Sequence, residues 1–427
     1  MTTASSRLTL LSLLYVVEGL PFGFQATALG VLLRDRGVSL AGIGLAGLLA
    51  VPWSLKALWA PLVDRHGSAR FGRRRSWIVP MQALLACALM GAGMLDPETE
   101  LVPLLCAVLG MNFVAATMDI AVDGLAVEIL RTRELGLGNA AQVVGYKVGM
   151  LLGGGVLLWA STSFPWSALF ACMAGLVLCA MVVTLLVPEP ASETTREEKV
   201  RASARDILRT LRDALRVPGV GALLFAIIGY KMGESLIEPM WTPFLRDHGL
   251  SRATIGLYVG TFGMVASILG SLSGGVLATT TSLPRALALA SAFRVVALAG
   301  QAAVAWQDAP SHLLVAVSTC AEHFFSGVLT TVMFALMMSR TDRRIGATHY
   351  TLLATIEVLG KAPLSLASGF IADAIGVRGA FALGVGLSLG YVLALISPFV
   401  QRGLALTERD GSGSVATASD PAPSAST

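Results

Sequence analysis

The chain alternates between long apolar blocks and short polar connections. Most blocks are about 20 residues or longer, which at 1.5 Å per residue lets a helix cross the ~30 Å hydrocarbon core of a bilayer. The blocks are uniformly apolar and lack the period-two alternation of barrel strands, so we predict helices. Twelve blocks can be drawn, at about 8–33, 40–62, 77–94, 101–128, 138–160, 166–187, 217–246, 253–279, 284–306, 312–339, 347–372 and 378–401.

The composition agrees with this pattern. Of the 427 residues, 55% are hydrophobic and only 14% are charged, with a mean hydropathy of +0.72. A soluble protein keeps roughly a quarter of its residues charged, so this chain has too little charged surface to cover its apolar content in water. All five cysteines lie inside apolar blocks and no C-x-x-C occurs, so we expect neither a disulfide nor a metal site.

Lysine and arginine concentrate at the N-terminal end, in the even-numbered connections and at the C-terminal end. The odd-numbered connections hold only Arg34, Arg36, Arg246, Arg252 and Arg378. The positive-inside rule therefore predicts that both termini are cytoplasmic.

One connection is repeated half a chain later. "LRDRGVSLAGIGL" (33–45) joins blocks one and two, and "LRDHGLSRATIGL" (245–257), identical at most positions, joins blocks seven and eight. Parallel repeats of six helices joined by a cytoplasmic linker are typical of the major facilitator architecture, in which the substrate lies between the halves. We therefore predict an all-α membrane protein with this fold and 12 transmembrane helices; chance convergence of two polar turns is the alternative.

The repeat sets the predicted domain boundaries. We expect a six-helix bundle over 1–187, a cytoplasmic linker with an amphipathic helix over 188–216, and a second bundle over 217–401. The tail, 402–427, contains "GSGSVATASDPAPSAST" and has no apolar face, so we expect it to be disordered.

The connection after block two, "APLVDRHGSARFGRRR" (60–75), resembles the G-x-x-x-D-R-x-G-R-R signature of major facilitators, although the leading glycine is absent and extra residues intervene. The resemblance implies a conformational latch built from Asp64, Arg65, Arg73 and Arg74. Positive-inside topology alone would also account for the arginines.

Six ordered stretches resemble a narrower family, the peptide/acetyl-CoA transporters that include AmpG-type muropeptide permeases. They are "EGLPFGFQ" (18–25), "LKALWAPLVDR" (55–65), "MDIAVDGLAVE" (118–128), "GYKVGMLLGGG" (145–155), "YKMGE" (230–234) and "ATHYTLLATIEVLGK" (347–361). The first and last are most similar to an animal orphan relative of the acetyl-CoA transporter. The resemblance implies proton-linked transport of an acylated or peptide-like organic anion, and the Ala- and Gly-rich composition favours a bacterial inner membrane.

Ionisable residues at membrane depth are the main functional candidates, because each costs several kcal/mol unless it faces water or a partner. The cations Lys147, Lys231 and Lys361 are candidate anchors for an anionic solute. Candidate proton carriers are Asp119, Asp123, Glu234, Glu18, Glu238 and Glu322. The alternative is that these charges form structural ion pairs; a latch role for Asp123 and a structural pair of Glu357 with Lys361 remain open.

Four further side chains are candidate solute contacts: Tyr146, Gln25, Tyr350 and Trp241. Each could equally be a packing or interfacial residue. His323 is a candidate proton relay with the same reservation.

Together these features predict a secondary active transporter, proton-coupled, that moves an acyl-CoA, peptide or muropeptide-like anion by alternating access. An uncoupled exchanger or uniporter, and a non-transporting receptor or partner subunit, remain alternatives. No nucleophile, metal-protease or nucleotide-binding motif occurs, so we expect no enzyme activity and no cofactor. The expected partners are lipid, a small anionic solute and protons, without nucleic acid, and we expect a monomer.

Overall fold

A computed structural model describes residues 4–29, 33, 46–68, 70–96, 99–161, 163–187, 204–214 and 216–406. In this part of the chain every regular element is a helix. Nearly all of the first copy of the repeated motif, the first part of the predicted linker and residues 407–427 of the tail lie outside the described residues.

The N-terminal helices follow the first six predicted blocks, and three of the blocks are made of several consecutive helical pieces. In chain order the pieces are α1 (Ala4–Gly23), η1 (Phe24–Ala28), η2 (Ala46–Ala50), α4 (Val51–Leu55), η3 (Lys56–Leu58), α5 (Ala60–Arg65), α6 (Arg75–Met94), α7 (Leu101–Ile129), η4 (Thr132–Glu134), α8 (Leu135–Leu151), η5 (Leu152–Val156), α9 (Leu157–Ala160) and α10 (Trp166–Leu186).

The C-terminal helices follow the last six blocks. They are α13 (Val220–Gly229), α14 (Met232–Asp247), α15 (Arg252–Ile255), η6 (Gly256–Phe262), α16 (Gly263–Thr280), α17 (Leu283–Ala305), α18 (His312–Ser339), η7 (Arg343–Ile345) and α19 (Gly346–Leu395). Gly376, with φ at +77°, breaks α19 into two rods that correspond to blocks eleven and twelve. A left-handed backbone conformation of this kind favours glycine, which explains the residue at the turn.

Eight helical segments of the described chain are long and apolar enough to cross a membrane, and shorter pieces complete the remaining blocks. The all-α fold expected from the sequence is therefore confirmed. Many large apolar side chains are exposed on these helices, as expected where lipid is the solvent.

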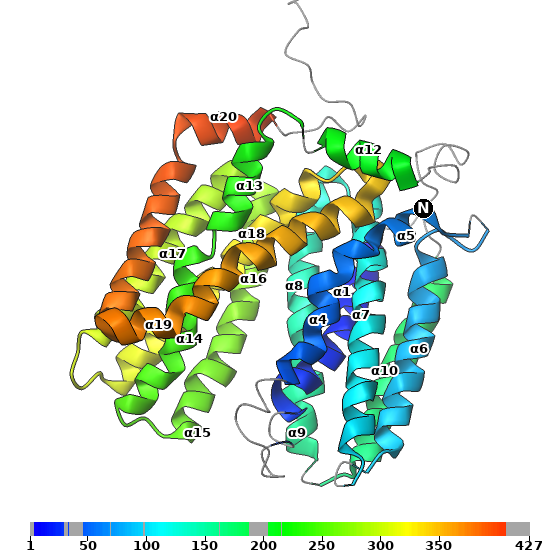
Figure 1. Cartoon of the computed structure of the whole chain (residues 1–427), viewed down its shortest axis with the longest axis horizontal. Helices are drawn as coiled ribbons and strands as arrows, with labels where there is room; N and C mark the ends of the chain where they lie inside the picture. Colours follow the sequence, from blue (N-terminus) through cyan, green and yellow to red (C-terminus); the bar gives the residue numbers. More distant parts are fainter. Residues whose placement is uncertain are drawn as a thin grey trace, which may run out of the picture.

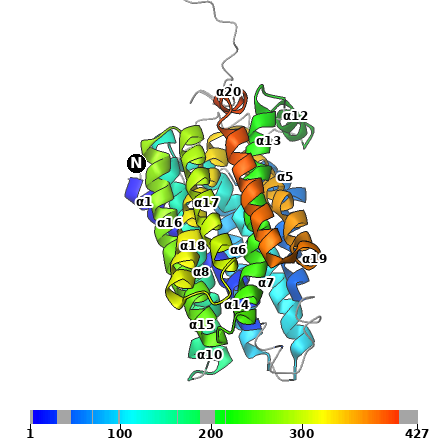
Figure 2. The ribbon, with the colours of Figure 1, turned by 90° about the vertical axis from the view of Figure 1, so that its left-hand side faces the viewer.

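Two groups of helices lie side by side (Figures 1 and 2). The helices α1–α10 form one group and α13–α19 the other, and they meet where α8 packs against α16 and α18 and where α7 packs against α19. The short helices α12 (Ala204–Ala214) and α20 (Pro398–Leu406) lie at one end of the molecule, which we call the α12 end (Figure 1).

Close packing of α8 on α1 depends on glycines spaced four residues apart. A Cβ atom built on Gly145, Gly149 or Gly153 would lie 2.1–2.7 Å from a backbone carbonyl oxygen of α1. No other side chain fits there, so the two helices approach at backbone distance, which is typical of helix pairs in membranes.

Replacing Gly149 with alanine should therefore destabilise the protein by about 1–3 kcal/mol, the usual range for overpacking. Its Cβ would meet the Val16 carbonyl oxygen at 2.1 Å. Thermal unfolding in detergent measures the effect, with Gly175→Ala as the matched control, since a Cβ at Gly175 meets nothing within 4 Å. Equal unfolding temperatures for the two variants would contradict this account of the packing.

Candidate functional site

The predicted latch residue Asp64 lies at the α12 end, where it contacts both groups of helices. Its Oδ1 accepts hydrogen bonds from Arg73 Nη2 at 3.0 Å and Arg74 Nη2 at 2.8 Å, and its Oδ2 accepts one from the backbone N–H of Thr348 on α19 at 2.6 Å. Arg74 also binds Glu128 of α7 at 2.8 Å. The predicted latch member Arg65 is exposed and takes no part in these contacts.

The electrostatics of Asp64 keep this latch ionised at neutral pH. Burial alone would raise the pKa of the Asp64 carboxyl, but Arg74, Arg73 and the Thr348 hydrogen bonds outweigh burial and hold the pKa below its ordinary value. A carboxyl with a lowered folded-state pKa contributes stability above its unfolded pKa and loses it only as the pH falls through the folded value. The latch therefore does not titrate near neutrality.

A buried cluster of charges lies within the N-terminal group of helices. Lys56 of η3 forms an ion pair with Asp119 of α7. One turn away, Asp123 Oδ1 accepts hydrogen bonds from Tyr15 OH at 2.9 Å and from Gln142 Nε2 at 3.0 Å. These contacts lie inside the protein, since each of the five residues is less than 9% exposed.

This N-terminal cluster is joined to the other half by Tyr350 of α19. Its hydroxyl donates to Gln142 Oε1 at 3.2 Å, and the amide of Gln142 in turn binds Asp123. The predicted solute contact Tyr350 is thus part of the interface between the halves, and it is 1% exposed.

Two other predicted contacts lie further along the N-terminal helices. The amide oxygen of Gln25 accepts a hydrogen bond from Asn112 at 2.6 Å, and Asn112 accepts one from the indole of Trp53 at 2.9 Å. Tyr146 packs against Trp53 and Phe22, with ring centroids 6.0 Å away in both cases. The ammonium group of Lys56 lies 5.5 Å from the centre of the Trp53 ring, so these aromatic side chains adjoin the charged cluster.

A cavity of about 470 Å³ lies among the C-terminal helices, and Lys147 reaches it from α8 of the N-terminal group. Six of the predicted anchors and proton carriers line it: Lys147, Lys231, Lys361, Glu234, Glu238 and Glu322. His323, Ser267 of α16, Ser326 of α18 and neighbouring small residues complete much of the wall. The cavity therefore gathers charges from α8, α14, α18 and α19 in one place.

Lys231 lies at a break in helix seven, because α13 ends at Gly229 and α14 begins at Met232. The backbone of Lys231 is non-helical, with φ −115° and ψ 8°. The first turn of α14 thus lies beside the cavity, and the positive end of its helix dipole favours anions there.

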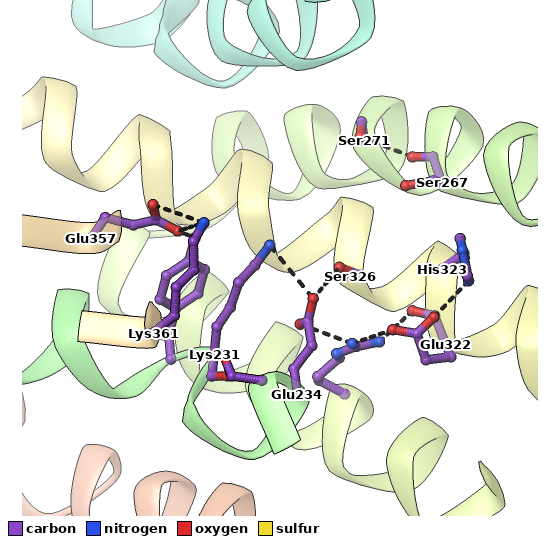
Figure 3. Close-up of polar contacts among 12 residues, drawn as sticks. Lys231, Glu234, Ser267, Ser271, Glu322, His323, Ser326, Glu357 and Lys361 are labelled. Carbon is purple, nitrogen blue, oxygen red and sulfur yellow. Dashed lines mark hydrogen bonds and ion pairs between the residues drawn. The ribbon is translucent and has the colours of Figure 1, made fainter. Parts of the chain in front are cut away.

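Arg294 of α17 joins two of the cavity carboxylates, Glu234 and Glu322. Figure 3 shows these two glutamates with their neighbours Lys231 and His323. The guanidinium of Arg294 binds Glu234 at 2.8 Å and also pairs with Glu322. Glu234 is shared with Lys231 at 3.6 Å, and Glu322 is shared with His323 at 2.6 Å. Arg294 is 2% exposed, and helical periodicity alone does not single it out as the partner of two glutamates.

Lys361 and Lys147 differ in how they are neutralised. Lys361 pairs with Glu357 at 2.9 Å, as its i, i+4 spacing suggested, and Glu357 also accepts a hydrogen bond from Tyr230 at 2.5 Å (Figure 3). In the part of the chain that the structure describes, Lys147 has no carboxylate within ion-pair distance. Its ammonium group donates only to Ser267, at 2.5 Å, and to the Ser271 hydroxyl, at 3.2 Å.

Trp241, also predicted as a solute contact, lies elsewhere. It is 2% exposed and packs with Phe244 and Phe381, and its indole N–H donates to Thr319 at 3.1 Å. It does not line the cavity. Its surroundings are those of a packing residue.

Comparison with known proteins agrees with this architecture. A family model described as acetyl-coenzyme A transporter 1 matches residues 7–164. The anhydromuropeptide permease of Escherichia coli K12 is 30% identical over 394 residues, covering 91% of this chain and 79% of the permease. The chain belongs to the AmpG-like family of anhydromuropeptide permeases. A putative transporter, AmpG 4 of Rickettsia conorii, is 24% identical over 91% of this chain and 96% of its own length.

Solved structures support the same fold for this AmpG-like protein. The human organic anion transporter MFSD10 (TETRAN) aligns with a TM-score of 0.65 at 14% identity, covering 92% of this chain and all of that chain. The transporter FucP, in an outward conformation, aligns with a TM-score of 0.63 at 15% identity over 92% of this chain and 99% of its own. Because its relatives are permeases and transporters and its helices are apolar enough to span a membrane, the AmpG-like chain is an integral membrane transporter and not an enzyme.

The latch generates a direct prediction. Asp64→Asn removes the charge that binds two arginines and the Thr348 N–H. Hydrogen bonds to charged groups contribute about 1.5–3 kcal/mol. The backbone amide of Thr348 should therefore exchange with deuterium roughly tenfold faster or more in this variant. Mass spectrometry of the peptide that contains Thr348 measures this rate. Asp308→Asn is the control, because Asp308 pairs with Arg378 on an exposed surface. Unchanged exchange in Asp64→Asn would rule out this latch.

Proposed function

We propose that this AmpG-like protein is a proton-coupled carrier of the bacterial inner membrane that moves a peptide-like organic anion by alternating access. The cavity described above is the proposed solute site. We further propose that the solute binds there between lysines contributed by both halves, and that the halves move relative to each other around it.

The observation that carries the proposal is that Lys147 has no carboxylate partner among the described residues. It is a cation at membrane depth whose described partners are the hydroxyl and carbonyl oxygens of Ser267 and the hydroxyl of Ser271. It shares a 470 Å³ cavity with Lys231 and Lys361. An ammonium group that lines a cavity and has no counter-charge beside it offers a charge-assisted contact to an anion that enters the cavity. The cavity falls within the usual ~300–1,000 Å³ range of small-molecule sites.

The mixture of charges in the cavity favours a peptide-like solute over an acyl-CoA. Three glutamates line the same wall as the three lysines. Glu238 is exposed to the cavity, and no ion pair or hydrogen bond from a described residue reaches its carboxylate. A polyphosphate group would be repelled by these carboxylates, whereas a solute with both carboxylate and amino groups finds partners of each sign. The name of the Escherichia coli relative, an anhydromuropeptide permease, supports the same solute class.

Charge balance supports coupling to protons. In the cavity and the layer behind it, four cations face four carboxylates: Lys147, Lys231, Lys361 and Arg294 face Glu234, Glu238, Glu322 and Glu357. An arriving anion would leave this region with a net negative charge in a low-dielectric environment. Binding a proton with the anion restores neutrality, which lowers the cost of enclosing the loaded site.

The contacts between the halves support an alternating-access interpretation. The Asp64–Thr348 hydrogen bond and the packing of α19 on α5 and α7 join the halves at the α12 end. We place this end in the cytoplasm, together with both termini, because Arg73, Arg74 and Arg344 lie there. The described state is then closed toward the cytoplasm, and we propose that a monomer performs the whole cycle.

Loss of Lys147 should weaken solute binding. Lys147→Ala removes a charge-assisted contact of about 1.5–3 kcal/mol, so we expect roughly 10–100-fold weaker binding of an anhydromuropeptide probe. Microscale thermophoresis with purified protein measures the dissociation constant, and Lys231→Ala should behave similarly. Arg378→Ala, an exposed cation outside the cavity, should bind as wild type does. Wild-type affinity in both lysine variants would defeat the site assignment.

Proton coupling has a separate prediction. Proteoliposomes containing the wild-type protein should take up labelled anhydromuropeptide faster, and above its equilibrium level, when the lumen of the vesicle is made more alkaline than the outside. A protonophore should abolish this accumulation while leaving downhill uptake. Indifference to the pH gradient would instead favour an exchanger or uniporter, and absence of any uptake would favour a receptor or partner subunit.

A further inference from the structure

Glu18 of α1 lies in the N-terminal group of helices, away from the cavity wall, and is 0% exposed. Neither of its carboxyl oxygens has a hydrogen-bond partner among the described residues. This sets Glu18 apart from the neighbouring acids. Asp119 pairs with Lys56, and Asp123 accepts two hydrogen bonds.

The charges that face Glu18 give an ionised carboxylate little support. From α7 it meets Asp119 and Asp123, and from η3 it meets Lys56, which is already bonded to Asp119. The tyrosine hydroxyls of Tyr15, on α1, and Tyr146, on α8, are the other titratable groups near it. The remaining elements packed on α1, namely η1, η5 and α10, carry no Asp, Glu, His, Lys or Arg.

An ionised Glu18 would therefore be a third negative charge beside a single lysine, buried without a hydrogen bond. Burying a charge without a partner costs far more than burying the same group in its neutral form, so the group takes up a proton instead. A protonated carboxyl also removes the repulsion with Asp119 and Asp123.

We propose that Glu18 is the proton-binding site of this carrier, in the N-terminal half and separate from the anion cavity. The protonation step itself rests only on the geometry around Glu18; its role in transport rests on the proposed function. The two halves then have separate roles: the C-terminal helices and Lys147 bind the solute, and the N-terminal cluster binds the proton.

A hydrogen-bond chain connects this cluster to the second half. Tyr15 donates to Asp123, Gln142 donates to the same carboxylate, and Tyr350 of α19 donates to Gln142. Tyr350 lies two turns before Glu357 on α19, and Glu357 pairs with the cavity residue Lys361. An ionised Glu18 would compete with Asp119 and Asp123 for Lys56 and Tyr15. Proton release would thereby disturb the hydrogen-bond chain that joins Asp123 to Tyr350 of α19.

Infrared spectroscopy tests the protonation without any solute. Purified wild-type protein at neutral pH should show the carbonyl stretch of a protonated carboxyl group. This band should be absent from Glu18→Gln and should therefore appear in the wild-type-minus-variant difference spectrum. The matched control is Glu238→Gln, which removes a glutamate that lines the cavity and also has no described ionic partner. The Glu18-dependent band should persist in that control.

The fold of the variant is checked in parallel. Glutamine resembles a protonated glutamate in size and charge, so Glu18→Gln should unfold at a temperature close to that of wild type. If Glu18→Gln fails to fold, Glu18→Asp keeps the acid and should shift the frequency of the same band. An identical protonated-carboxyl band in wild type and in the Glu18 variant, or no such band in wild type, overturns the proposal.

Transport then tests the coupling role, again with labelled anhydromuropeptide. In proteoliposomes, Glu18→Gln should lose at least tenfold of the accumulation driven by a pH gradient, yet retain exchange of labelled for unlabelled probe. A pH-gradient response equal to that of wild type overturns the coupling role of Glu18. If wild type itself ignores the gradient, the proposed coupled function fails, while the infrared result still decides whether Glu18 binds a proton.

Discussion

Compensation of buried charge is the constraint on which the rest of the structure depends. Lipid cannot solvate an ion, so each ionic side chain among these helices needs a partner inside the protein. Lys56 finds Asp119, Arg294 finds two glutamates, and Lys361 finds Glu357. Pairs of this kind fix neighbouring helices in register, and breaking one leaves an uncompensated charge that is costly to keep.

Among the described residues, Lys147 and Glu18 depart from this pattern in opposite ways. Lys147 is a cation that contacts only oxygen atoms of Ser267 and Ser271 at the edge of a cavity, and Glu18 is an enclosed acid whose oxygens accept no hydrogen bond from a described residue. One lacks an anion and the other lacks a proton donor or a cation. A co-transported anion and proton would satisfy these two needs, which is why we regard the exceptions as the functional groups.

The helix α8 brings the two groups into one mechanism. One side of it carries glycines that allow α1 to approach at backbone distance, and α1 carries Glu18. Another side packs on α16, where Lys147 meets Ser267, and Gln142 of the same helix binds both Asp123 and Tyr350. A movement of α8 relative to α16 would therefore change contacts in both the solute site and the acidic cluster.

The hydrophobic pattern predicted the helices well, because block length and turn position depend on local sequence. Charge at membrane depth also pointed to Lys147, Lys231 and Lys361, which the structure brings to one cavity. Helical periodicity does not tell which neighbour a helix faces. For that reason the sequence suggested Trp241 as a solute contact, although it packs in a core, and missed Arg294 as the centre of an ion-pair network. The break at Lys231 was also not predicted. Gly229 and Gly233 flank it, but glycines are frequent in membrane helices and do not by themselves mark a break.

The central claim is that an anionic solute binds between lysines of both halves. A cryo-electron microscopy map of the purified protein with a bound anhydromuropeptide tests it most directly. We expect density for the probe in the cavity, with an acidic group within hydrogen-bond distance of Lys147 and of Lys231 or Lys361. Density for the probe outside this cavity, with Lys147 still bound only to Ser267 and Ser271, would contradict it.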